Sequence, residues 1–191
     1  MMAAQAVEAA ALGVALHEVK ALLRVEHNDE DALIAGFIRS AEAACEAFTG
    51  LALVAREVRE IIPASHQWRR LELSPVRSIT GVAAVTADGG TAALGADSFA
   101  VDVDGSGDGW VRLVQGISAG RVQVTYAAGL AGDWNGVNEP LRHGIVRLAA
   151  HHYGVRDGGA GAGTAPPALV AALWRPWRRL PFGLPRGRSV S

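Results

Sequence analysis

One amphipathic stretch, residues 28–50, constrains the fold of this chain more than any other. Its apolar side chains recur at intervals of three and four residues: Leu33, Ile34, Phe37, Ile38, Ala41, Cys45 and Phe48. That spacing gathers them on one face of an α-helix. Asn28 or Asp29 is placed to cap the first turn, and Gly50 is placed to end the helix in a left-handed conformation. The sequence therefore predicts a helix whose apolar face is buried against other elements.

The elements on either side complete a mixed fold. Residues 16–25 repeat the helical pattern and predict a helical hairpin with the stretch at 28–50. Between residues 51 and 126, β-branched residues and glycine-rich turns predict a small antiparallel sheet, with strands near 51–62, 68–73, 76–85, 98–102, 110–114 and 121–126. The helical period returns at 139–156, and a short helix is expected at 168–174.

These elements predict the α+β class: mainly an α-helical bundle of about four helices, with a small antiparallel β insertion and an extended C-terminal tail. At 191 residues the chain suffices for one domain with tails. We expect a flexible N-terminus at 1–15 and a main domain at 16–157, in which residues 51–126 are the β-rich insertion. Residues 158–191 are expected to hold a glycine linker, a short helix and a basic tail.

Composition excludes several classes of protein. The formal net charge of −1 gives no global argument for nucleic-acid binding. The single cysteine, Cys45, excludes an internal disulfide and is expected to be a core residue. Residues 1–16 carry Glu8 and no basic segment, so we expect no signal peptide, and no apolar run approaches about 20 residues. We therefore expect a soluble protein that is made in the cytoplasm and has no membrane partner.

The motifs that could carry chemistry are weak. Residues 102–109 alternate acids and glycines like the start of a calcium loop, but the twelfth position holds Leu113 instead of glutamate, so a tight acidic turn is favoured over adventitious metal binding. His143, His151 and His152 lack the four-residue spacing that presents two imidazoles to one zinc ion. The one Gly-x-Ser-x-Gly sequence, residues 116–120 around Ser118, lies between two predicted strands and not between a strand and a helix, as a nucleophile elbow requires. We therefore expect no catalytic residue, no metal ligand, no cofactor and no enzymatic activity.

The C-terminal tail is the strongest candidate for function. Residues 173–182 combine two tryptophans, a phenylalanine and three arginines, which are types enriched at interface hot spots. Capping of the core can account for one tryptophan; docking on a protein or a phosphate backbone accounts better for the whole set, and a solvated or self-packed tail is the alternative. The expected docking residues are Trp174, Arg175, Trp177, Arg178, Arg179, Phe182 and Leu184.

Several segments, in this order and spacing, resemble the head–tail connector (adaptor) family of tailed bacteriophages, which includes the adaptors of gene transfer agents. The resemblance covers about residues 16–180, and neither the glycine run at 158–163 nor the sequence beyond 180 follows a family pattern. The matching segments are 16–20, 23–25, 29–34, 48–50, 73–79, 122–129 and 139–142, together with 151–153.

This resemblance implies a structural protein of the particle neck, assembled in the cytoplasm of the host bacterium. Such adaptors form a homo-oligomeric ring, commonly of twelve copies, beneath the portal protein. The ring extends the channel through which duplex DNA passes without sequence recognition. It binds the portal on one side, with the C-terminal segment implicated, and a neck or tail (stopper) protein on the other. An acidic N-terminal part suits such a channel, because tight binding of phosphate groups there would hinder the passage of DNA.

Two further expectations concern partners. On the helix at 28–50, four charged residues lie outside the apolar stripe and are predicted to face a neighbouring subunit: Glu30, Arg39, Glu42 and Glu46. The alternative function is a small DNA-associated protein that engages phosphates with its basic C-terminal tail.

Overall fold

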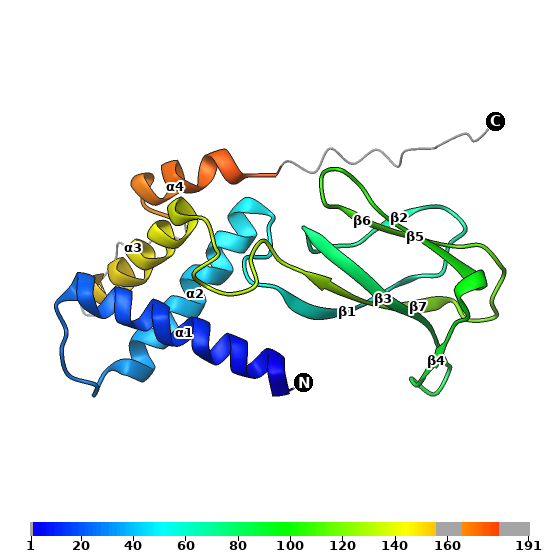
Figure 1. The fold of residues 1–191 in the computed structure, drawn as a ribbon, viewed down its shortest axis with the longest axis horizontal. Helices are drawn as coiled ribbons and strands as arrows, with labels where there is room; N and C mark the ends of the chain where they lie inside the picture. Colours follow the sequence, from blue (N-terminus) through cyan, green and yellow to red (C-terminus); the bar gives the residue numbers. More distant parts are fainter. Residues whose placement is uncertain (1, 156–165, 180–191) are drawn as a thin grey trace. The chain divides into compact units, whose positions relative to one another are not determined.

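The computed structural model describes residues 2–155 and 166–179, with side chains from residue 13 onward. The chain divides into two compact units: Met1–Val54 with Leu130–Arg179 form a helical unit, and Ala55–Gly129 form a β unit (Figure 1). The β unit is therefore inserted between the second and third helices. The prediction of an α+β fold with a β insertion is confirmed.

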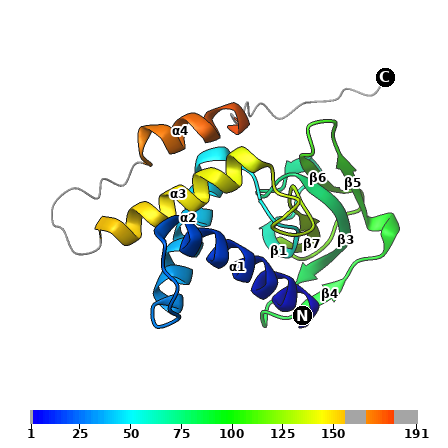
Figure 2. The same cartoon turned by 60° about the vertical axis from the view of Figure 1, so that its left-hand side comes forward.

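The helical unit contains four helices: α1 (Met2–Leu23), α2 (Asp31–Thr49), α3 (Glu139–Val155) and α4 (Ala168–Trp174), with α4 running into a short 3-10 turn, η2 (Arg175–Trp177). The first three pack on one another, and α4 covers α3 (Figure 2). α1 extends the helix expected at 16–25 back to Met2. The packing of α2 on α3 follows from their amphipathic sequences, because the apolar face of each helix covers that of the other.

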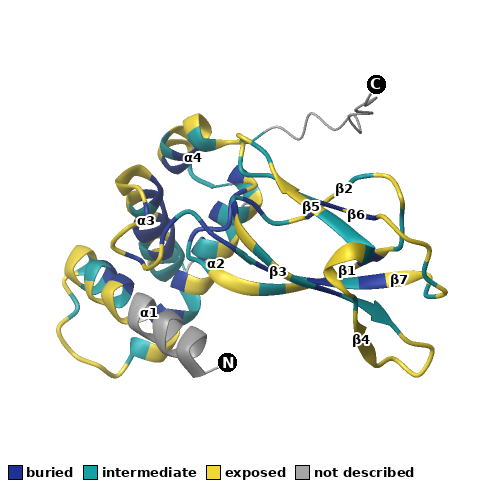
Figure 3. Ribbon diagram, turned by 45° about the vertical axis from the view of Figure 1, so that its right-hand side comes forward, coloured by how far each residue is buried: buried dark blue, intermediate teal, exposed yellow. Residues whose placement is uncertain are grey.

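The predicted core face of α2 is largely confirmed. Ile34, Ile38, Ala41 and Cys45 are fully buried, and they share one cluster with residues of α3 (Figure 3): Leu141, Ile145, Leu148 and Ala149. Phe37 and Phe48 pack at the margin of this cluster. The assignment of Leu33 to the core is wrong, since it is 43% exposed.

The ends of α2 differ in how well they were predicted. Gly50 ends the helix with φ 72°, and its N–H donates to the carbonyl of Glu46 at 2.8 Å, as expected for a left-handed stop. The predicted side-chain cap by Asn28 or Asp29 is wrong, because the cap position is Glu30 and no side chain bonds there. The Asn28 side chain instead accepts a hydrogen bond from Lys20 at 2.7 Å.

The β unit holds two antiparallel sheets instead of the one expected. The larger has the order β1-β7-β3-β4 and the smaller the order β2-β6-β5. The strands are β1 (Arg56–Pro63), β2 (Arg69–Arg70), β3 (Val76–Val85), β4 (Thr91–Ala93), β5 (Phe99–Val103), β6 (Gly109–Leu113) and β7 (Arg121–Ala128), with a 3-10 turn, η1 (Ala96–Ser98), before β5.

Two of the predicted strands are shorter than expected. β1 begins only at Arg56, because Leu51, Ala52 and Leu53 are buried in the helical unit, where the Leu130 N–H donates to the Ala52 carbonyl. The strand expected at 68–73 is reduced to the two residues of β2.

Tyr126 organises the centre of the larger sheet. It lies on β7, where every second residue is buried. Its hydroxyl donates to the Glu60 carboxylate at 2.8 Å and accepts from the Leu73 N–H at 3.3 Å. Burial, reinforced by the bond to Glu60, raises the pKa of Tyr126 well above its ordinary value. The phenol therefore stays protonated and serves as a fixed structural donor.

Candidate functional site

α4 brings the tryptophan-rich segment back onto the helical core. Trp174 is fully buried, its indole N–H donates to the Leu141 carbonyl at 3.3 Å, and its ring lies 5.9 Å from that of Phe48. Gly144 of α3 makes room for the indole, since a Cβ there would lie 2.8 Å from Cε2. Trp174 is therefore a core residue whose side chain is not exposed to a partner in this structure, and its role in portal docking stays a prediction.

The residues that follow are fixed across the C-terminal end of α2. The Arg179 N–H donates to the Thr49 carbonyl at 2.7 Å, and the Arg178 guanidinium lies 5.6 Å from the centre of the Phe48 ring. Arg175 and Arg178 are exposed, whereas Trp177 is half-buried against the core. Cationic side chains are favourable at this end of a helix, where carbonyl groups lack partners. The turn therefore presents arginines to solvent from a rigid base.

We name this surface the C-terminal platform and define it by Arg175, Trp177, Arg178 and Arg179. Figure 1 shows the segment running from α4 past the end of α2. The other two predicted docking residues, Phe182 and Leu184, lie outside the described residues, as does the glycine linker at 158–163.

The four charged residues predicted to face a neighbouring subunit divide into two pairs. Glu30 accepts a hydrogen bond from the Tyr153 hydroxyl, and Glu46 accepts one from the Leu53 N–H at 2.9 Å. Both carboxylates therefore act within the helical unit. Arg39 is exposed and Glu42 is half-exposed, so these two present charge on the outer face of α2.

The acidic loop at 102–109 is a structural turn. One oxygen of Asp104 accepts from the N–H groups of Ser106 and Asp108, at 2.8 and 3.1 Å, and the other accepts from the Trp110 indole at 3.0 Å. The carboxylate is thus occupied by the loop itself, as the tight-turn interpretation predicts. Within the described parts of the chain, no group of three histidine, cysteine or acidic residues could hold a metal ion.

The remaining reactive side chains are packed into the structure. Burial, with the nearby charges of Glu46 and Glu42, raises the pKa of Cys45 to about 12, so its thiol is not a nucleophile at neutral pH. His152 stacks on Phe37 with ring centres 6.1 Å apart, and its pKa is lowered first by burial and then by His151. Among the described residues, no helix is long and apolar enough to span a membrane.

The comparisons with known proteins point in one direction. Residues 14–78 match the family model of the phage gp6-like head–tail connector protein. One similar solved chain comes from the neck of an empty gene transfer agent (GTA) particle computed with C6 symmetry. It is 27% identical, with a TM-score of 0.71, over 88% of this chain and 91% of that one.

The matched segment is therefore similar to head–tail connector proteins. Two more solved structures resemble this chain. One is the neck of a native GTA particle computed with C12 symmetry, 28% identical with a TM-score of 0.68, covering 93% of this chain and 94% of that chain. The other is the virion of a native GTA particle, 27% identical with a TM-score of 0.63, covering 83% of this chain and 84% of that one. No curated protein matches this chain.

One feature of the site was not predicted from the sequence: the packing of Trp174 against Gly144. A glycine within a predicted helix, such as Gly144, often marks a position where another side chain packs closely. The sequence does not show which side chain packs against Gly144.

Proposed function

We propose that this chain is a head–tail adaptor in the neck of a phage or gene transfer agent particle, where it joins the capsid to the neck and tail. One observation carries the proposal: the chain resembles GTA neck chains at TM-scores of 0.68 and 0.71 over both of its units. Identities of 27% and 28% accompany that likeness. A structural role without catalysis fits the buried thiol of Cys45.

The proposed assembly is a ring of twelve copies beneath the portal, which extends the channel for duplex DNA. The symmetries of the similar neck structures, C6 and C12, support a closed cyclic arrangement. DNA would pass without sequence recognition, and a neck or tail (stopper) protein would bind the opposite side. The half-exposed Glu42 and the exposed Arg39 are proposed to face a neighbouring subunit.

The C-terminal platform is the proposed portal-binding surface, continued by Phe182 and Leu184. Its support is physical: Arg175 and Arg178 are exposed on a turn that is held by the hydrogen bond from Arg179 to Thr49. A rigid turn loses little conformational freedom on binding, and arginine and tryptophan are the side chains most often found at hot spots.

Reversing the two exposed charges of the platform tests this surface. The full-length variant Arg175→Glu with Arg178→Glu is expected to bind purified portal at least about tenfold more weakly. The reason is that the two introduced carboxylates would be repelled by portal groups that the two arginines attract. Pull-down and titration measure the loss. The matched control is Arg69→Glu with Arg121→Glu, which changes the same charge at exposed positions of the β unit. Equal binding by both variants would contradict docking through the platform.

The same variants decide between the adaptor and a DNA-associated protein with a basic tail. The adaptor role predicts that portal binding falls in the platform variant while the protein has no salt-dependent affinity for duplex DNA. A salt-dependent affinity of the wild-type chain that disappears with Arg175 and Arg178 would favour the DNA-associated role.

A further inference from the structure

The helical unit is electrically polarised. Residues 13–54, which include α2 and most of α1, carry seven acids against three bases. The described residues of α3, α4 and the platform, 139–155 and 166–179, carry one acid against five bases. These two sets of residues, which we call the acidic half and the basic half, thus carry formal charges of −4 and +4 with histidines neutral, and the connecting segment 130–138 adds one acid, Asp133. A chain with two complementary faces suits head-to-tail contacts, which close into rings when the rotation allows.

The acidic half projects a well-ordered corner, residues 24–30, between α1 and α2. The Lys20 ammonium ties the corner to the start of α2, bonding Asn28 at 2.7 Å and Asp31 at 2.6 Å. Arg24 has a φ of 57°, which is uncommon for a non-glycine residue. The corner is therefore a shaped element and not a loose loop.

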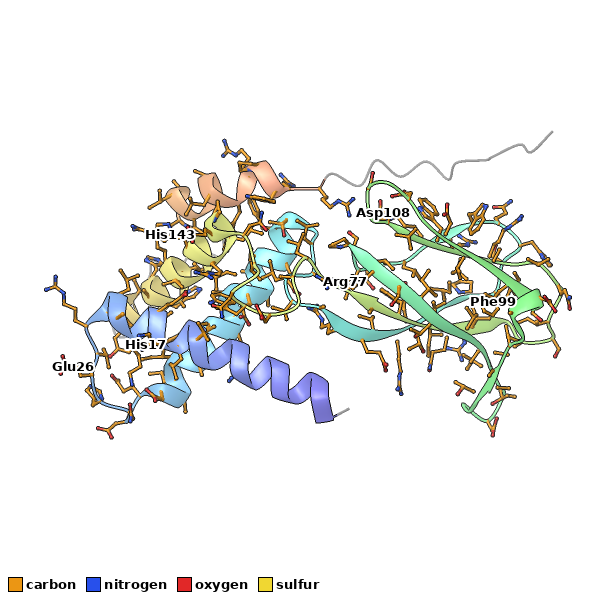
Figure 4. All side chains as sticks on the ribbon, in the orientation of Figure 1. His17, Glu26, Arg77, Phe99, Asp108 and His143 are labelled. Atoms are coloured by element: carbon orange, nitrogen blue, oxygen red, sulfur yellow. The ribbon has the colours of Figure 1, made fainter. Side chains whose placement is uncertain are left out.

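This corner presents acids and apolar side chains together. Glu26 is exposed on the loop in Figure 4, and the Asp29 side chain is 93% exposed. Nδ1 of His27 lies 3.8 Å from Oδ2 of Asp29. On the flanking helices, Leu22 is 50% exposed and Leu33 is 43% exposed. Apolar contact area bordered by exposed polar groups is the usual composition of a protein interface.

The basic half presents a matching surface. On α3, three exposed side chains follow one another at four-residue intervals, on the side opposite the core: His143, Arg147 and His151. We call them the α3 stripe. Arg147 donates to His143 at 2.7 Å, which holds its guanidinium along the helix (His143 is labelled in Figure 4).

A hollow lies beside the α3 stripe. Its apolar lining, Pro140, Val146 and Leu173 of α4, forms a border to the stripe, and its polar lining consists of Glu18, Glu139, Arg142 and His143. Glu18 and Arg142 pair with each other at 3.4 Å. Leu169, one helical turn before Leu173 and 53% exposed, continues this border. The surface therefore offers leucines next to a cation, the complement of the corner.

We infer that in the proposed ring the corner of one copy docks on the α3 stripe of the next copy. Glu26 and Asp29 then pair with Arg147, and Leu22 and Leu33 pack toward the border formed by α4. Among the described residues, no ion pair joins the corner to the stripe within one chain. The occupant is a second copy of this chain, so the inference rests on the proposed function.

Charge reversal on each side, followed by mixing, tests the contact. Full-length corner variant Glu26→Arg with Asp29→Arg, and stripe variant Arg147→Glu with His151→Glu, are each incubated with purified portal. Each alone is expected to form at least tenfold fewer rings than wild type, as counted by electron microscopy and native mass spectrometry. The equimolar mixture is expected to regain rings in which the two variants alternate, because every contact in such a ring again joins opposite charges.

The controls distinguish a loss of docking from a loss of folding. They also distinguish failure of this inference from failure of the proposed function. The variant Asp97→Arg with Asp102→Arg changes the same charge at exposed sites of the β unit and is expected to form rings normally. Circular dichroism shows whether the corner and stripe variants are folded. Wild-type chain that forms no ring on portal would overturn the proposed function. Rings formed normally by either variant alone, or none formed by the mixture of two folded variants, would overturn the inference alone.

Discussion

Replacing Trp174 with alanine is expected to lower the free energy of unfolding of the helical unit by about 3–5 kcal/mol, the cost usual for deleting a buried aromatic side chain. The indole is fully buried, fills the space above Gly144 and donates to the Leu141 carbonyl. Its removal leaves a cavity between α3 and α4 and releases the base on which the C-terminal platform stands.

Denaturant unfolding followed by circular dichroism measures this loss. The matched control is Trp177→Ala, which removes a half-buried tryptophan three residues later and is expected to cost clearly less. If the Trp174 variant lost less than about 1 kcal/mol, the indole would not be the packing centre described above. A truncation meant to test portal docking should accordingly begin after Arg179 and leave Trp174 in place.

Replacing Gly109 with valine is expected to destabilise the β unit by at least about 1–3 kcal/mol, the range for overpacking a core. Gly109 begins β6, where a Cβ would lie 2.7 Å from Val76 Cγ2 and 2.9 Å from Leu71 Cδ1. Val76 and Leu71 are 5% and 1% exposed, so neither has room to withdraw.

Thermal unfolding of the full-length chain checks this expectation. The control Gly105→Val lies in the same acidic loop, where nothing is within 4 Å of an added Cβ, and is expected to change the melting temperature little. A melting temperature of the Gly109 variant equal to that of the control would show that β6 does not pack against the Val76 region as described.

The helical part of the fold could be read from the sequence because helical periodicity is a local property. The positions of Ile34, Ile38 and Cys45 recur at helical spacing, and all three are fully buried in α2. Gly50 ends the helix for an equally local reason, its tolerance of positive φ.

What the sequence did not predict depends on partners distant along the chain. Asn28 resembles a helix cap, but Lys20 competes for its side chain. Trp174 resembles an interface residue until Gly144 is seen to make room for it. The division of the strands into two sheets is set by pairing across tens of residues, such as β1 with β7, and no local pattern records it.

The candidate site follows the same rule. The exposure of Arg175 and Arg178 agrees with the composition of the tail, whereas the hydrogen bond from Arg179 to Thr49 that fixes the turn joins residues far apart in sequence. In the sequence, the residues of the α3 stripe resemble any exposed side chains of a helix. They become a candidate interface only when the structure shows the oppositely charged corner.

The most direct test of the adaptor role is electron microscopy of particles made with and without this chain. Without the chain, we expect capsids that carry portal but lack the neck ring and tail, and supplying the chain from a plasmid should restore attachment. Tailed particles of normal appearance in its complete absence would contradict the adaptor role.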